Sequence, residues 1–282
     1  MSIILASNSY GKSAVRLLKL ERSGAHHGIR ELSVDIALTG AFAAAHTDGD
    51  NSLVLPTDTM KNTVYAKARE GTLGAPEEFG VVLATHFLDA SAAAQTATVT
   101  VTEHGWRRLD VDGVQHHHAF ERKSSELRIA RVSLERGGVA SIVAGIDDLL
   151  ILKSGQSAFS GYPRDKYTTL RETEDRILAT SISTQWRYSA KTTGFDARFH
   201  DVRRALLETF ADHESKSVQH TLYAMGEAVL KQCEDVEEIS ITMPNKHHLL
   251  VDLAPIGLDN PNEIFVPTSE PFGLIEATLR RG

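Results

Sequence analysis

Apolar and polar residues alternate along two runs near the start of the chain, residues 15–17 and 32–38, with a polar link at residues 22–28 between them. A period of two places the apolar side chains on one face of an extended strand. Two such runs joined by a short polar segment are typical of an antiparallel hairpin. We therefore predict that the chain begins with a β-hairpin that buries one of its faces.

Helical patterns follow this hairpin. The apolar run at residues 53–55 ends at Pro56, and a helix is expected through residues 60–70. A second helix is expected to begin at Ala75-Pro76-Glu77-Glu78, and its apolar stripe comprises Phe79, Val82, Leu83 and Phe87. Residues 96–102 and 125–134 again resemble strands, so the first half is predicted as β-β-α-α-β-β.

The same order of elements recurs after the turn at Arg136-Gly137-Gly138. Strands are expected at residues 139–143 and 149–152, around Trp186 and Tyr188, and at 239–243 and 249–253. A short helix is expected at residues 167–179, and amphipathic helices are expected at 195–211 and 217–233. The two halves share little residue identity. We predict an α+β protein with a duplicated unit, the first copy spanning residues 1–136 and the second 137–282.

The composition is that of an ordinary globular protein. The length of 282 residues suits one large domain or two of about 140 residues each. With 37 acidic and 30 basic side chains the net charge is −7, which argues against nucleic acid or an anionic membrane as the main partner. The single Cys233 excludes an intrachain disulfide, and the apolar start is too short for a signal peptide or membrane span. We expect a cytoplasmic location.

Thr57 and Asp58 follow Pro56 at the point where the apolar run passes into the first helix. A threonine or aspartate at this position usually caps the free backbone N–H groups of the first helical turn. A hydroxyl and backbone N–H groups at a helix N-terminus also suit an anion or a proton-exchanging ligand. The residues alone favour capping and leave the second function open.

Three further polar side chains are candidates for chemistry. Lys12 acts as a general base only when it is desolvated, and most lysines are solvated. Arg176 lies four residues after Glu172, which favours an i,i+4 ion pair on the expected helix, although arginine also binds planar ligands through paired hydrogen bonds. Gln219 is usually a surface residue at a helix start, but its amide can present a donor and an acceptor to a flat heterocycle.

Phe159 lies in a segment rich in glycine and serine, where core packing is the common role and stacking on a ligand ring the alternative. Asn245 and His247 flank a lysine, so they share one side of an extended backbone; such a pair is usually structural but can relay protons. The run at residues 116–118 favours no metal site, because adjacent strand residues point to opposite faces. No cofactor-binding motif such as Gly-x-Gly-x-x-Gly, His-Glu-x-x-His or Cys-x-x-Cys occurs.

Ordered motifs along the whole chain resemble those of the urate oxidase (uricase) family. The matching segments are Tyr10-Gly11-Lys12 with Val15-Arg16, Thr57-Asp58-Thr59-Met60-Lys61-Asn62-Thr63-Val64-Tyr65, Arg164-Asp165-Lys166-Tyr167-Thr168-Thr169-Leu170, Asp175-Arg176-Ile177-Leu178, Val218-Gln219, Pro244-Asn245-Lys246-His247, Asp259-Asn260-Pro261-Asn262-Glu263 and Gly273-Leu274-Ile275-Glu276-Ala277. Their number and order make this resemblance far more specific than any single residue.

The resemblance implies a tunnelling fold (T-fold) with two ββααββ repeats per chain, whose antiparallel sheets form a barrel on oligomerisation with the helices outside. It also implies a homotetramer with active sites at subunit interfaces. The implied reaction is the oxidation of urate by dioxygen and water to 5-hydroxyisourate and hydrogen peroxide, a step of purine degradation. Neither a metal nor an organic cofactor is expected.

The resemblance also implies which residues would bind the substrate. Arg176 and Gln219 resemble the clamp that holds the two ends of urate, and Phe159 resembles the ring that stacks on it. The backbone around Val218 would provide a further hydrogen bond. Urate is an anion near neutral pH, so an acidic protein needs a local counter-ion such as Arg176.

Proton transfer and oxygen binding are implied for a second group of residues. Lys12 and Thr57 resemble the proton-abstracting pair, and Thr57 and Asp58 would come from the neighbouring subunit. Asn245 resembles the residue that holds dioxygen or water above the substrate ring, and His247 resembles the proton relay to Lys12.

Two alternatives remain open from the residues. Another enzyme of the same fold could hydrolyse a pterin or purine with a metal, but one cysteine without spaced histidines counts against a zinc site. A non-catalytic purine-binding protein would need Arg176 and Gln219 but not Lys12, Thr57 or His247.

Overall fold

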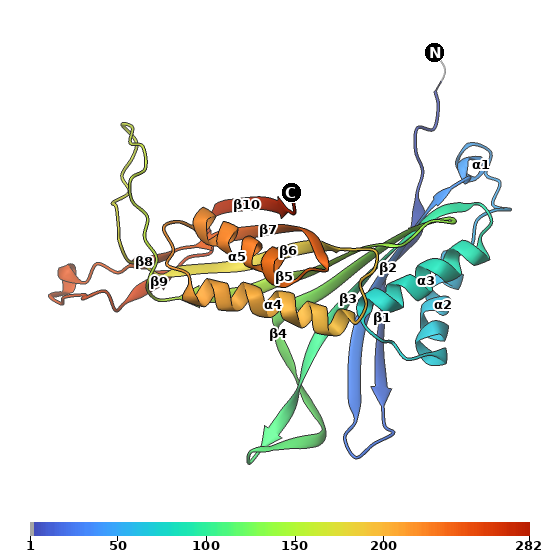
Figure 1. The fold of residues 1–282 in the computed structure, drawn as a ribbon, viewed down its shortest axis with the longest axis horizontal. Helices are drawn as coiled ribbons and strands as arrows, with labels where there is room; N and C mark the ends of the chain where they lie inside the picture. The colour runs from blue at the N-terminus through green and yellow to red at the C-terminus, as the bar shows by residue number, and fades with distance from the viewer. Residues whose placement is uncertain (1–2) are drawn as a thin grey trace. The chain divides into compact units, whose positions relative to one another are not determined.

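The computed structural model describes residues 3–282 and divides into two compact units. The first unit extends to Gly145 and includes Arg187–Ala197, and the second comprises Ile146–Trp186 and Arg198–Gly282. The first two residues of the apolar start lie outside the described part of the chain. Both units combine strands with helices, so the predicted α+β class is confirmed (Figure 1). The boundary between residues 136 and 137 stays a prediction.

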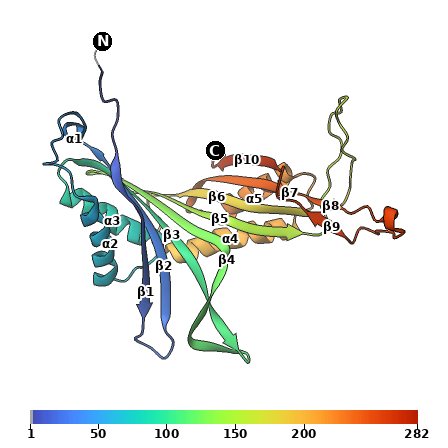
Figure 2. The ribbon, with the colours of Figure 1, turned by 180° about the vertical axis from the view of Figure 1, so that it is seen from behind.

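The first unit is a four-stranded antiparallel sheet with helices on one face. Its elements are β1 (Tyr10–Glu21), β2 (Gly28–Gly40), the short α1 (Ala43–Thr47), α2 (Thr57–Glu70), α3 (Pro76–Ala90), β3 (Ala94–Val111) and β4 (Val114–Glu135). The strands follow the order β1-β2-β3-β4, and each pairing is antiparallel. Helices α2 and α3 lie on the same side of these strands (Figures 1 and 2).

The predicted hairpin is confirmed, because Val15 pairs with Val34 and Leu17 with Leu32. Alternate residues of β2 are buried under the two helices, as the period of two predicts. Each fully buried aliphatic or aromatic side chain contributes about 1.5–3 kcal/mol relative to leaving it in water. The centre of this core consists of Leu32, Val34, Ile36 and Leu38 with Met60, Val64, Leu83 and Phe87.

β3 and β4 are longer than the sequence pattern predicts. The expected strands at residues 96–102 and 125–134 lie within them, but pairing continues to the turn between Val111 and Val114. Charged side chains line this extension, and Arg107 forms an ion pair with Glu121 across the two strands at 2.6 Å. A ribbon without a buried face has no apolar alternation, so a periodicity argument cannot detect it.

The second unit holds most of β5 (Ser141–Lys153), β6 (Leu178–Tyr188) and α4 (Phe195–Asp212), together with α5 (Val218–Gln232), β7 (Val236–Lys246), β8 (His248–Leu250), the 3-10 helix η1 (Ala254–Ile256), β9 (Phe265–Pro267) and β10 (Gly273–Arg280). Its main strands follow the order β5-β6-β7-β10, and β7 pairs antiparallel with β10. Helix α5 packs against β7 and β10.

Both amphipathic helices of the second half are confirmed with their expected faces. Their buried residues are Phe199, Val202, Leu206 and Phe210 on α4 and Val218, Leu222, Met225 and Val229 on α5. The two strands expected at residues 139–143 and 149–152 are one strand, β5, which begins at Ser141. The polar residues between those runs still belong to the strand, and Asp147 and Asp148 accept hydrogen bonds from Ser183 and Ser181.

The helix expected at residues 167–179 is wrong. Residues 167–177 are irregular, and Leu178 begins β6. The backbone of Thr173 instead pairs with that of Phe159 through two hydrogen bonds of 2.7 and 3.1 Å. The alternation at residues 249–253 is also mostly outside a strand, since β8 ends at Leu250. Strand β10 was not expected, because its side chains are largely exposed and follow no clear alternation.

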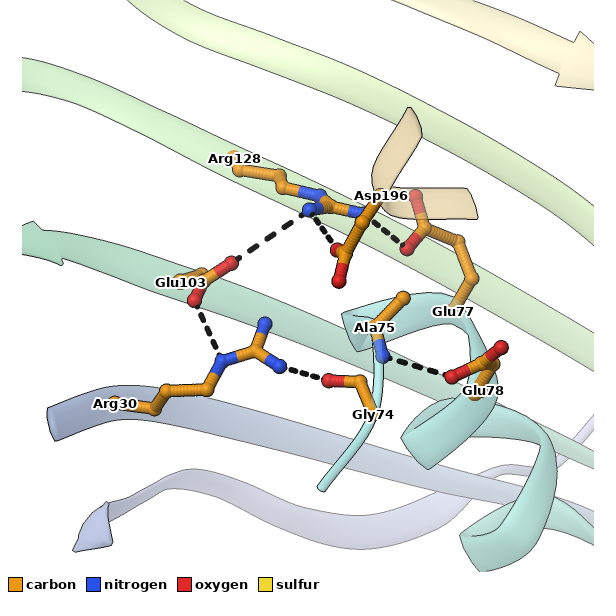
Figure 3. Close-up of polar contacts among 8 residues, drawn as sticks. All are labelled: Arg30, Gly74, Ala75, Glu77, Glu78, Glu103, Arg128 and Asp196. Carbon is orange, nitrogen blue, oxygen red and sulfur yellow. Dashed lines mark hydrogen bonds and ion pairs between the residues drawn. The ribbon is translucent and has the colours of Figure 1, made fainter. Parts of the chain in front are cut away.

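A buried charge network connects helix α3 with the strands of the first unit (Figure 3). Arg128 on β4 donates hydrogen bonds to Glu77 at 2.7 Å and Asp196 at 2.6 Å. Glu103 lies 3.9 Å from Arg128 and accepts a hydrogen bond from Arg30 at 2.9 Å. Burial raises the pKa of the fully buried Glu77 carboxyl, against the opposing charge of Arg128.

No helix among residues 3–282 is both long enough and apolar enough to cross a bilayer.

Candidate functional site

Lys12 lies on β1 beside the start of α2. An added Cβ at the preceding Gly11 would lie 1.7 Å from the carbonyl oxygen of Ile36, so only glycine allows this close approach of β1 to β2. The pairing register shifts directly after Lys12, and this irregularity interrupts the strand at the candidate base. The Tyr10 hydroxyl accepts a hydrogen bond of 3.0 Å from the backbone N–H of Leu55, which connects β1 to the segment before α2.

Thr57 and Asp58 begin α2, but the expected capping interaction is wrong. The N-cap residue is Pro56, which forms no side-chain capping bond to the free N–H groups at this end of the helix. The Asp58 carboxylate instead accepts hydrogen bonds from Lys61 and from Asn62, the latter at 3.0 Å. The exposed Thr57 therefore stands at a helix N-terminus whose backbone donors are open.

The charge of Asp58 connects this helix start to Lys12. The hydrogen bond and charge of Lys61 lower the pKa of the Asp58 carboxyl, and the charge of Lys12 adds to this shift. Lys12 and Asp58 are therefore close enough to interact within one chain. The structure thus brings together the three predicted residues of the first unit, Lys12, Thr57 and Asp58.

Phe159 and Arg176 lie together in the second unit. The guanidinium carbon of Arg176 lies 5.2 Å from the centre of the Phe159 ring, within the range of a cation–π contact. Tyr162 stacks on Phe159 with ring centres 4.9 Å apart. The pairing of Phe159 with Thr173 brings these side chains together, although 17 positions separate Phe159 from Arg176 in the sequence.

Arg176 is a partly buried cation with an open donor. Its Nε is buried and has no hydrogen-bond partner within residues 3–282. Burial lowers the pKa of its guanidinium, which nevertheless stays protonated at neutral pH. The i,i+4 ion pair with Glu172 is wrong, because the segment is not helical and Glu172 accepts from the backbone N–H of Gly161 at 3.3 Å. A desolvated cation without a fixed anion suits an anionic ligand.

Val218 and Gln219 are the first two residues of α5. Ser217 caps this helix by accepting a hydrogen bond of 3.1 Å from the backbone N–H of His220. The Val218 side chain is buried and fixes the helix start, whereas Gln219 is exposed. The backbone N–H of Ala158 donates to the carbonyl of Ser215 at 2.7 Å, which brings the Phe159 segment beside this helix start.

Asn245 and His247 lie at the end of β7. Asn245 pairs with Gly273 on β10, and the backbone N–H of Thr268 donates to the carbonyl of His247 at 2.8 Å. Both side chains are partly buried. The flanking residues Lys246 and His248 line a cavity of about 400 Å³.

The predicted residues thus fall into two groups. Lys12, Thr57 and Asp58 belong to the first unit. The second unit carries the other predicted residues, which are Phe159, Arg176, Val218, Gln219, Asn245 and His247.

Two supporting residues were not predicted as site residues, although both lie in motifs that resemble those of the uricase family. These are Tyr10, whose hydroxyl accepts from Leu55, and Asp175, which accepts from the backbone of Ser157 at 3.5 Å.

The histidine run at residues 116–118 lies on β4, close to the turn of the β3–β4 ribbon. The rings of His117 and His26 are 4.7 Å apart between centres, and those of His116 and His118 are also 4.7 Å apart. Across residues 3–282, no group of three or more histidine, cysteine or acidic side chains is arranged to hold a metal ion.

Antiparallel strands with packed helices in each unit define an α+β protein, and its second unit carries a partly buried arginine beside an aromatic ring. The family model for uricase matches residues 8–133 and 142–276. The chain therefore belongs to the uricase family.

Individual relatives agree with this assignment along the whole chain. The uricase of Arthrobacter globiformis is 47% identical over 279 residues, which cover 99% of this chain and 90% of that protein. The uricase of Aspergillus flavus is 37% identical over 297 aligned positions, covering 100% of this chain and 98% of that protein.

Solved structures confirm the T-fold. The crystal structure of uricase from Arthrobacter globiformis has a TM-score of 0.94 at 47% identity, and the match covers 100% of this chain and 96% of that chain. The urate oxidase of Bacillus sp. TB-90 shares the fold with a TM-score of 0.85 at 21% identity, over 97% of this chain and 100% of that chain.

Proposed function

We propose that this urate oxidase oxidises urate with dioxygen and water to 5-hydroxyisourate and hydrogen peroxide, using only its own side chains. Two electrons pass from urate to dioxygen, one oxygen from water is added to the purine ring, and two protons complete the peroxide. The observation that carries the proposal is the position of Arg176. Its guanidinium carbon lies 5.2 Å from the Phe159 ring centre, and its Nε is buried without a hydrogen-bond partner within residues 3–282.

Substrate binding follows from the second-unit residues. Arg176 binds one end of the planar anion through paired hydrogen bonds, and Gln219 presents its amide to the other end. Phe159 stacks on the ring, and the backbone N–H of Val218, which has no partner within its helix, provides a further donor. The positive end of the α5 dipole stabilises the anion.

Proton transfer involves the first-unit residues. Thr57 carries a proton from the substrate to Lys12, so the purine becomes electron-rich enough to reduce dioxygen. Asn245 holds dioxygen or water above the ring, and His247 relays protons to Lys12. In this proposal the protein orients, deprotonates and excludes competing water, and the substrate is the electron source.

The active site is proposed to form between subunits of a homotetramer. Thr57 and Asp58 come from the neighbouring chain. Because Lys12 interacts with Asp58 within one chain, we infer that Lys12 comes from the same neighbour. Exposed apolar side chains on the second unit favour association, among them Leu150 at 61%, Leu249 at 57% and Leu274 at 57% exposure. We place the enzyme in the cytoplasm, in keeping with its single cysteine.

The test is aerobic incubation of the chelator-treated protein with urate while urate loss, oxygen uptake and peroxide formation are followed together. The expected result is equal consumption of urate and oxygen, with one peroxide per urate. Unchanged urate would refute the oxidase function. Turnover that returns only after a metal is restored would refute the cofactor-free mechanism.

A further inference from the structure

Arg281 closes the far end of the helix that carries Val218 and Gln219. Its guanidinium donates to the carbonyl of Leu230 in the last turn of α5, to that of the C-cap residue Cys233 at 3.1 Å, and to that of Val236, where β7 begins, at 3.0 Å. The last carbonyls of a helix have no partner within it, so the bond to Leu230 satisfies such a group. The carbonyl of Cys233 also accepts from the backbone N–H of Val236 at 3.0 Å, so Arg281 is its second donor. One side chain thus joins the end of α5, the start of β7 and the end of β10.

Arg136 makes the same set of contacts at the end of α3. Its guanidinium donates to the carbonyls of Leu88 at 2.7 Å, Ser91 at 2.7 Å and Ala94 at 3.0 Å. Leu88 and Leu230 each lie two residues before the helix end, Ser91 and Cys233 are the two C-caps, and Ala94 and Val236 begin the next strands. The backbone N–H groups also match, since Arg136 donates to Gln95 and Arg281 to Glu237.

Arg281 and Arg136 differ in which residues lie at the other ends of the helix and strand that each of them joins. From the Arg281 corner, α5 leads back to Gln219 and β7 leads forward to Asn245. These two stretches are about 20 Å and about 30 Å long at the usual rise per residue. From the Arg136 corner, α3 leads back to Ala75 and β3 leads forward to Val111, and neither end carries a proposed substrate residue.

We propose that Arg281 is a positioning residue for urate oxidation. By fixing α5 against β7 at their shared corner, it sets where the substrate clamp at Gln219 lies relative to Asn245. This inference rests on the proposed function of those two residues. Helices and strands transmit displacement because they are rigid, and a shift of about 1 Å in a reacting group can change a rate by about a hundredfold.

The experiment compares Arg281→Lys with the matched control Arg136→Lys. Lysine keeps the charge, but all its donors lie on one nitrogen, so they cannot occupy both the Nε and the terminal nitrogen positions from which Arg281 reaches these carbonyls. Both variants are expected to lower the unfolding temperature by similar amounts. Only Arg281→Lys should raise KM for urate, by roughly tenfold, whereas Arg136→Lys should leave it within about twofold.

Hydrogen exchange provides a measurement that does not depend on turnover. Amides of residues 217–221 should exchange faster in Arg281→Lys than in the parent protein, although they lie at the opposite end of α5. If Arg281→Gln is used as a stronger variant and does not fold, the lysine variant still gives both measurements.

Equal KM changes in the two lysine variants would overturn the inference, and so would unchanged exchange at residues 217–221. A parent protein without urate turnover would instead refute the proposed function, and hydrogen exchange would still show whether the Arg281 contacts control the start of α5.

Discussion

Replacing Arg128 by methionine should destabilise the first unit more than any loss of a surface ion pair. Methionine fills much of the space of the arginine stem but has no charge and no donor. The change leaves the Glu77 carboxylate without its partner at 2.7 Å, in a place with no solvent exposure. Glu77 Oε1 already lacks a hydrogen-bond partner among the described residues, so the carboxylate would have little compensation.

The magnitude follows from the burial of each partner. Removing one member of a buried ion pair costs about 3–5 kcal/mol, and we expect this range for Arg128→Met. The matched control is Asp196→Asn, which removes the second partner of Arg128. Because the Asp196 side chain is 57% exposed, its loss should cost about 1 kcal/mol or less. Replacing Glu77 by leucine in the Arg128→Met background should recover much of the lost stability, because no buried charge remains.

The pH dependence gives a second check on the same prediction. Burial raises the pKa of Glu77 already in the parent protein, and loss of the Arg128 charge raises it further. A carboxyl whose folded pKa lies above the unfolded value loses stabilisation as pH rises through that window. The gap between the parent and Arg128→Met should therefore widen from pH 5 to pH 8, by up to about 1.4 kcal/mol per pH unit.

Urea unfolding followed by tryptophan fluorescence and circular dichroism at pH 5 and pH 8 measures these free energies at one fixed protein concentration. A penalty for Arg128→Met that does not change with pH would show that Glu77 is not the group left uncompensated. An equal penalty for Asp196→Asn would contradict the argument from burial.

Four further predictions concern the site and its surroundings. Lys12→Met should abolish turnover while calorimetry still detects urate binding, and loss of both would refute a role in proton transfer alone. Arg176→Gln should raise KM for urate at least tenfold in steady-state assays, because the buried counter-ion is lost. Burial disfavours ionisation of Glu31, yet hydrogen bonds from Arg16 and Trp106 and the charge of Arg122 hold its carboxyl pKa below the usual value. The ionised carboxylate therefore stabilises the fold above about pH 4, and this stabilisation is lost on acidification. Glu31→Gln should therefore cost about 1–3 kcal/mol at pH 7 and less at pH 3 in urea titrations. Activity per chain should fall on dilution as tetramers dissociate, and constant activity down to monomer, seen by light scattering, would refute a shared site.

The elements with a buried face could be predicted from the sequence. The alternation of β2 and the apolar stripes of α4 and α5 correspond to side chains that the structure buries. Elements without such a face left no periodic signal, which explains the missed β3–β4 extension and the missed β10. The false helix at residues 167–179 has a different origin, because a non-local pairing of Thr173 with Phe159 overrides local helical propensity.

The candidate site shows the same division between local and non-local information. Residue types alone identified Arg176 as a possible anion ligand, but its burial and its contact with Phe159 depend on the pairing of distant segments. The capping interpretation of Thr57 was wrong because Pro56 occupies the N-cap position. The proposed role of each residue therefore rests on motifs matched along the whole chain, and local patterns provided only the candidates.

A short sequence pattern occurs at the ends of two strands, once in each half of the chain. Leu134-Glu135-Arg136-Gly137 and Leu279-Arg280-Arg281-Gly282 share the pattern Leu-x-Arg-Gly at the ends of β4 and β10. A pattern of four residues with one variable position is too short to identify a repeat from the sequence alone. Their matching contacts with a helix end and the next strand give the pattern a physical cause, because each layer of helix on sheet needs a donor for the carbonyls where the chain leaves the helix. Arg136 and Arg281 thus provide the same donors at two helix ends. Only Arg281 joins elements, α5 and β7, that carry proposed substrate residues at their other ends.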